Sequence, residues 1–159
     1  MSTSRELTES SLRPAVCDAI EEAATGLDAT GVRALRVLLH AGMCAYWPLV
    51  KGKPDRQIAA YEATVNTLRQ RWSATGETVG DPTAIALFRQ MDAEAIYFLR
   101  LCAERSGTVW LEPLDSVATY LVSVLYGMVM RWLADGNDET TLVVIDDLVA
   151  SLTLKAVEN

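Results

Sequence analysis

The stretch LDSVATYLVSVLYGMVMRWLA, residues Leu114 to Ala134, decides the fold of this chain. On an α-helix its apolar residues fill two adjoining arcs, so no wide polar side remains to face water. The first arc holds Leu121, Val124, Leu125, Met128 and Trp132, and the second holds Val122, Tyr126, Val129, Met130 and Leu133. The core of the chain can cover one flank, and a symmetric copy most simply covers the other, as in a two-fold four-helix interface. The sequence therefore predicts a homodimer.

The last helix is expected from Glu139 to Val157 and has the same two-sided apolar pattern. The short connection ADGNDE precedes it, so the last two helices are expected to be antiparallel neighbours. These two helices are the predicted dimer interface. Arginine in place of Val124 or Val144 is expected to disrupt it.

The same apolar stretch is long enough to suggest a transmembrane helix. Asp115, Ser116, Ser123 and Arg131 interrupt it, however, and its flanks show no positive bias. The N-terminal residues show no basic segment followed by an apolar one, which is the pattern of a signal peptide. We therefore expect a cytoplasmic protein without a membrane partner.

Composition favours a single globular domain over residues 1–159, because half of the residues are hydrophobic and only 22% are charged. The formal net charge of −7 disfavours binding to nucleic acid by this chain alone. Cys17, Cys44 and Cys102 are expected to be reduced core residues, since each lies in an apolar helical context. With a single histidine and no metal-ligand spacing, neither a metal site nor a cofactor is expected.

The apolar residues repeat with helical spacing, and no strand is expected. About six helices are predicted, and the chain is therefore assigned to the all-α class. They run from about Ser10 to Ala24, Ala29 to Trp47, Asp55 to Trp72, Asp81-Pro82 to Arg105, Leu114 to Ala134 and Glu139 to Val157. Pro48 is expected to end the second helix, and Gly107 follows the fourth.

The third and fourth helices show the clearest buried arcs. The inward stripe of the third is predicted to be Ile58, Tyr61, Val65, Leu68 and Trp72. The buried arc of the fourth is predicted to be Leu87, Phe88, Met91, Ala95, Phe98 and Cys102.

Several short motifs occur in a fixed order from Leu38 onward. They are Trp47-Pro48, Pro54-Asp55-Arg56-Gln57, Tyr61-Glu62 and Leu68-Arg69, followed by Gly127, Trp132-Leu133, Asp135 and the helix from Asp138 to Leu152. In this order and spacing the chain resembles the C-terminal ligand-binding and dimerisation domain of tetracycline-repressor-like (TetR) transcription regulators. The resemblance implies a helical bundle with a two-fold four-helix interface and an apolar ligand pocket.

The N-terminal part departs from that family, whose members begin with a DNA-binding helix-turn-helix unit. Here the segment after Ala41-Gly42 contains Trp47-Pro48, where proline would break the helix that enters the major groove. We therefore expect residues 8 to 47 to form the first helices of the ligand-binding domain. The chain alone is expected not to bind DNA.

The resemblance also suggests where a ligand binds. In the family an apolar pocket lies between the middle helices and the dimerisation helix, and a few polar groups orient the ligand. The candidate lining residues are Tyr61, Met91, Trp110, Tyr120 and Tyr126, although each also fits plain core packing. Aromatic side chains suit a flat or aromatic apolar ligand.

Four ionisable residues are candidates for acid–base catalysis: Glu62, Glu94, Asp92 and His40. Glu62 and Glu94 lie at the edges of apolar stripes, where burial would raise their pKa, but solvated or salt-bridged positions are the more common case at such edges. His40 shares a helix side with Arg33 and Arg36, which favours a solvated imidazole. No nucleophile, phosphate-binding or dinucleotide motif is present in the sequence, and nothing in it requires an enzyme.

Three functions fit this sequence. The first is a homodimeric domain that senses or sequesters a small apolar or aromatic ligand. The second is an enzyme that uses the same pocket for cyclisation, isomerisation or elimination of an apolar metabolite. The third is a dimerisation partner of full-length TetR-like regulators.

Overall fold

Six helices and one two-stranded sheet make up the part of the chain that the computed structural model describes, residues 12–74 and 82–159. The elements are α2 (Leu12–Thr25), α3 (Val32–Lys51), α4 (Pro54–Ala74), α5 (Pro82–Ser106), β1 (Thr108–Trp110), α6 (Leu114–Asp135), α7 (Asp138–Thr153) and β2 (Ala156–Glu158). Helices hold 84% of the described residues, which confirms the all-α prediction.

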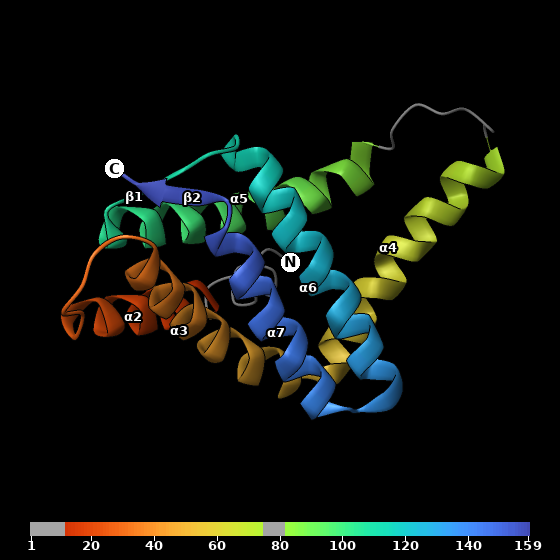
Figure 1. Cartoon of the computed structure of the whole chain (residues 1–159). Coiled ribbons are helices and arrows are strands. Elements are labelled where there is room, and N and C mark those ends of the chain that lie inside the picture. Colours follow the sequence, from red (N-terminus) through yellow and green to blue (C-terminus); the bar gives the residue numbers. More distant parts are fainter. Residues whose placement is uncertain (1–11, 75–81) are drawn as a thin grey trace.

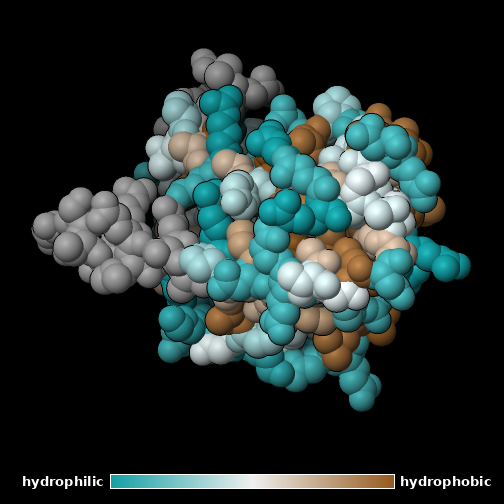
Figure 2. All heavy atoms as spheres, turned by 90° about the vertical axis from the view of Figure 1, so that its left-hand side faces the viewer, coloured by the Kyte–Doolittle hydropathy of each residue, from teal (hydrophilic) through white to brown (hydrophobic). Residues whose placement is uncertain are grey.

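Helices α3, α5, α6 and α7 enclose the core (Figure 1). Leu35, Leu38 and Leu39 of α3 are fully buried, as is Leu99 of α5. α6 and α7 lie side by side and antiparallel, as the short connection between them predicts (Figure 1). Seen from the side of α2 and the small sheet, hydrophobic side chains form separate patches among hydrophilic ones (Figure 2).

The prediction that Pro48 ends its helix is wrong, because α3 continues to Lys51. Met43, Trp47 and Val50 are buried on successive turns, and Trp47 packs edge-on against Trp132 with ring centroids 5.2 Å apart. A proline this close to a helix end removes one backbone hydrogen bond, and burial of the turn that carries Val50 outweighs that loss. α3 is also continuous through Ala41 and Gly42, so residues 32–51 contain no turn of a helix-turn-helix.

The expectation of no strands is wrong in two short segments. Thr108–Trp110 pairs antiparallel with Ala156–Glu158, with Val109 opposite Val157. Consequently α7 ends at Thr153 and does not reach Val157. Strands of three residues are too short to show the alternating pattern by which strands are recognised in a sequence.

The two apolar arcs of α6 both contribute to the core of the chain itself. Leu121 and Met128 of one arc and Val122 and Val129 of the other are all at most 8% exposed. The exposed side of α6 carries Ser116, Thr119, Ser123, Gly127, Met130 of the second arc and Ala134, with Asp115 and Arg131 exposed near its two ends. Both apolar arcs are therefore partly covered by the chain itself, the uncovered face carries mainly small residues and Met130, and the homodimer stays a prediction.

The inward stripe predicted for α4 is also largely wrong. Tyr61 is 8% exposed, but Ile58, Val65 and Trp72 are 44%, 46% and 57% exposed. α4 extends away from the bundle towards its C-terminal end (Figure 1). Its apolar side therefore faces a groove and solvent over most of its length.

Within the described residues, α6 is the one helix that is long and apolar enough to cross a membrane. A third of its most apolar window is buried inside the chain. Length and composition of one helix are weak evidence for a membrane, since the central helix of a globular bundle meets the same criteria.

Candidate functional site

A groove of about 560 Å³ lies between α4 and α6 and is open to solvent. Its apolar walls are Ile58, Tyr61 and Val65 of α4 together with Met130, Leu133 and Ala134 of α6. Its polar lining residues are Glu62, Asn66 and Arg69, all from α4. Small-molecule sites combine apolar walls with a few polar groups and have volumes of roughly 300–1,000 Å³. The groove has this composition and size.

Tyr61, which lines this groove, belongs to a cluster of three aromatic rings. The rings of Tyr61 and Tyr126 pack edge-on with centroids 4.4 Å apart, and Phe88 lies 5.4 Å from Tyr126. The Tyr61 hydroxyl donates a 2.6 Å hydrogen bond to the backbone carbonyl of Tyr126. Burial raises the pKa of Tyr61, and it raises the pKa of the nearby Tyr46 to about 12. These tyrosines are therefore neutral hydrogen-bonding groups near neutral pH.

The structure brings together two of the five predicted ligand-binding residues, Tyr61 and Tyr126. Met91 is half-buried and packs against the core. Tyr120 is also half-buried, and the Lys155 ammonium lies 5.3 Å from its ring centroid. Trp110 belongs to a separate hollow near the small sheet.

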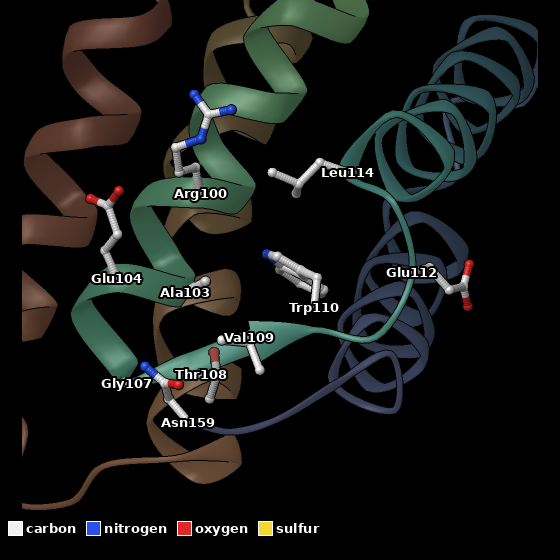
Figure 3. Close-up of a pocket in the computed structure, with 10 residues that line it drawn as sticks. All are labelled: Arg100, Ala103, Glu104, Gly107, Thr108, Val109, Trp110, Glu112, Leu114 and Asn159. Carbon is white, nitrogen blue, oxygen red and sulfur yellow. The ribbon is translucent and has the colours of Figure 1, made fainter.

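That second hollow has a volume of about 450 Å³ and lies beside the C-terminal part of α5 (Figure 3). Trp110 fills one side of it, and its indole N–H donates to the Leu99 carbonyl at 3.2 Å. Arg100 and Glu104 project from α5 at its edge, and Asn159 lies near Gly107 (Figure 3). Its lining holds the charged residues Arg100, Glu104 and Glu112, whereas Glu62 and Arg69 are the charged residues of the groove.

The four acid–base candidates lie in different places. Glu62 lines the groove. Glu94 is exposed and receives two hydrogen bonds from Arg13, at 2.7 and 2.8 Å. Asp92 is half-buried, and burial followed by the charge of Asp115 raises its pKa. Of the four candidates, only Glu62 therefore lies beside the groove.

The fourth candidate, His40, lies on the exposed side of α3, as predicted, next to Cys44. The assignment of all three cysteines to the core is wrong, because Cys102 is buried, Cys17 is half-buried and Cys44 is exposed. An apolar context in sequence does not settle which side of a helix a thiol occupies. In residues 12–74 and 82–159 no group of three or more His, Cys, Asp and Glu side chains could hold a metal ion.

Sequence reasoning missed the groove, although it singled out most of the residues involved. The sequence predicts Ile58 and Val65 inside the fold, and it places Met130 and Leu133 in one of the two apolar arcs of α6. The sequence signal for this groove is that α4 has an apolar side and that α6, the helix opposite it, has no wide polar side. Comparisons with family models, curated proteins and solved structures give no match to this chain.

Proposed function

We propose that this chain is a homodimeric domain of the TetR ligand-binding type that binds a small apolar or aromatic molecule in the groove between α4 and α6. The observation that carries the proposal is the groove itself, whose wall holds Ile58, Val65 and Met130 together with the aromatic ring of Tyr61. A soluble chain seldom leaves so much apolar surface together without a ligand or partner to cover it.

The direct test replaces one groove valine and one matched valine elsewhere. Val65, in the groove, is 46% exposed, and Val37, on α3, is 49% exposed. Aspartate at either position stays at the surface of the isolated chain, so the two variants differ mainly in whether the groove changes. We expect Val65→Asp to weaken binding of the fluorescent apolar dye anilinonaphthalene sulfonate by about tenfold, the loss of one buried apolar contact. Val37→Asp should leave binding unchanged.

Equal loss in both valine variants would contradict the assignment of the groove. Trp110→Ala separates the groove from the second hollow, because Trp110 lines only the latter of the two. If Trp110→Ala abolishes dye binding and Val65→Asp does not, the ligand site lies beside the small sheet. Tyr61→Phe is expected to weaken binding as well, since it removes the hydroxyl of a residue that lines the groove.

The dimer is proposed to form through the exposed faces of α6 and α7. Between Asp115 and Arg131 the exposed face of α6 carries no charged residue. On α7, Leu142 and Val143 are 52% and 58% exposed. A helix face without charge and exposed aliphatic side chains on the neighbouring helix suit a self-complementary helical interface, although Asp146 and Asp147 are also exposed on α7.

The two substitutions that the sequence suggests for disrupting the dimer are unsuitable. Val124 and Val144 are half-buried and pack against the core, so arginine at either position would damage the chain itself. Val143→Arg changes an exposed side chain instead. We expect Val143→Arg to be folded and monomeric in sedimentation, and a wild-type chain that is already monomeric at micromolar concentration would contradict the proposal.

The enzymatic alternative rests on Glu62, the acid–base candidate that lines the groove. A catalytic carboxylate there would have to act on the bound molecule, whereas a binding domain would leave that molecule unchanged. Any small molecule that copurifies with the chain is incubated with wild type and with Glu62→Gln and then analysed by mass spectrometry. A product that forms only with wild type would establish an enzyme.

A further inference from the structure

Three side chains on the surface between α3 and α7 form a series of thiol, imidazole and carboxylate. Sγ of Cys44 lies 3.6 Å from Nδ1 and 3.7 Å from Nε2 of His40. Nε2 of His40 lies 3.5 Å from Oδ1 of Asp146. Cys44 and His40 are four residues apart on α3 and thus share a helix side, whereas packing of α7 against α3 supplies Asp146. A nucleophile, a base and a group that can orient the base are therefore adjacent.

In the isolated chain this cluster is accessible to a reagent in solution. The Cys44 side chain is exposed, and those of His40 and Asp146 are 52% and 66% exposed. Cys17 is half-buried and has Arg13, Asp18, Glu21 and Glu94 as charged neighbours, and Cys102 is buried. Of the three cysteines, Cys44 alone combines exposure with an imidazole in contact.

We propose that Cys44 is a modification site that undergoes thiol–disulfide exchange with low-molecular-weight disulfides, with His40 as the base and Asp146 as a positioning residue. Sγ of Cys44 attacks one sulfur of the small disulfide, so that a new S–S bond forms as the old one breaks. The thiol proton moves to a ring nitrogen of His40 and then to the departing thiolate. The products are a mixed disulfide on Cys44 and one free small thiol, and the incoming disulfide is the only oxidant that the step requires.

The raised pKa of the Cys44 thiol makes a general base necessary for the exchange. Partial desolvation by neighbouring atoms and the negative charge of Asp146 raise the pKa of the Cys44 thiol above its ordinary value. Cys44 is therefore protonated near neutral pH, and a thiolate is not formed in advance. Exchange then depends on a group that accepts the proton during the attack, and His40 is the group in contact with the sulfur.

The experiment measures the rate at which the folded full chain reacts with dithiobis-nitrobenzoate, a small aromatic disulfide that releases a coloured thiol. At neutral pH we expect one cysteine to react fast, and this phase should be absent in Cys44→Ser. His40→Asn should slow the fast phase by about tenfold or more, because an effective general base contributes at least that much. A fast phase that survives Cys44→Ser, or an unchanged rate in His40→Asn, would overturn the proposal.

Two substitutions at Asp146 isolate its positioning role. Asp146→Asn and Asp146→Ala remove the same charge, but only asparagine keeps an oxygen that can accept the Nε2–H of His40. We therefore expect Asp146→Ala to react more slowly than Asp146→Asn. Asp147→Asn, an equal charge change on an exposed neighbour, is the control and should leave the rate close to that of wild type. Equal rates for the two Asp146 variants would overturn the positioning role.

Discussion

Gly127 lies in the middle of the exposed face of α6. A methyl group added there should have opposite effects on the stability of the isolated chain and on the proposed dimer. A Cβ built at this position meets no other atom within 4 Å, and Gly127 has no left-handed backbone conformation that alanine would strain. In the isolated chain, Gly127→Ala should therefore add stability through helix propensity alone, by roughly 0.5–1 kcal/mol. For a chain of this length that corresponds to an increase in Tm of about 1–4 °C.

In the proposed dimer the same methyl group has the opposite effect. Small residues at 123 and 127 permit a close approach of two helices, and a methyl group at each copy of Gly127 would force them apart. Overpacking at a contact costs about 1–3 kcal/mol, so the dissociation constant of the dimer should rise by about tenfold or more.

The assay uses two backgrounds. Urea unfolding in the Val143→Arg background, expected to be monomeric, should show that Gly127→Ala raises the free energy of unfolding. Sedimentation in the otherwise wild-type background should show that Gly127→Ala weakens the dimer. If the substitution stabilises the monomer and leaves dimer dissociation unchanged, this face of α6 is not the interface.

Two further predictions concern the fold itself. A Cβ at Gly42 would lie 3.1 Å from Cζ of Phe98 and closer still to Cε2. Gly42→Ala should therefore lower the free energy of unfolding by about 1–2 kcal/mol in urea titrations, once its gain in helix propensity is subtracted. Equal or greater stability would contradict the close approach of α3 and α5. Hydrogen bonds from Lys51 and Trp132 hold the pKa of Asp138 below its ordinary value, so the stability they provide is present at neutral pH and is lost as the pH falls through that lowered value. The difference in free energy of unfolding between wild type and Asp138→Asn should therefore shrink in acid. A difference that does not change with pH would contradict this.

The helical part of the fold could be predicted because its signals are local. Gly107 ends α5 with φ of 70°, and Gly136 follows α6 with φ of 63°, both in the left-handed region that glycine adopts most easily. The predicted arc of α5 is correct, since Phe98 and Cys102 are buried and Phe88 and Met91 are half-buried. Helix ends and apolar arcs depend on residues that lie within a few turns of one another.

The site could not be predicted because it depends on what covers each apolar side. Helical spacing places Ile58 and Val65 on the same side of α4 as Tyr61, but only packing shows that Tyr61 alone is buried. Likewise, the sequence places Cys44 one turn from His40, whereas Asp146 joins them only because α7 packs on α3. Periodicity shows that a helix has an apolar side and does not show whether its own chain, a ligand or a second copy covers that side.

The groove and the proposed dimer face adjoin at Met130. This residue is 43% exposed, lines the groove and also lies on the exposed face of α6 proposed as the dimer interface. A second copy that packs on α6 would therefore border the groove and reduce its opening to solvent.

A ligand in the groove would then contact a more enclosed site in the dimer than in the monomer. By thermodynamic linkage, a ligand that binds the dimer more tightly must strengthen dimerisation by the same factor. Under the proposed function, ligand binding and self-association are thus a single coupled equilibrium centred on this edge of α6.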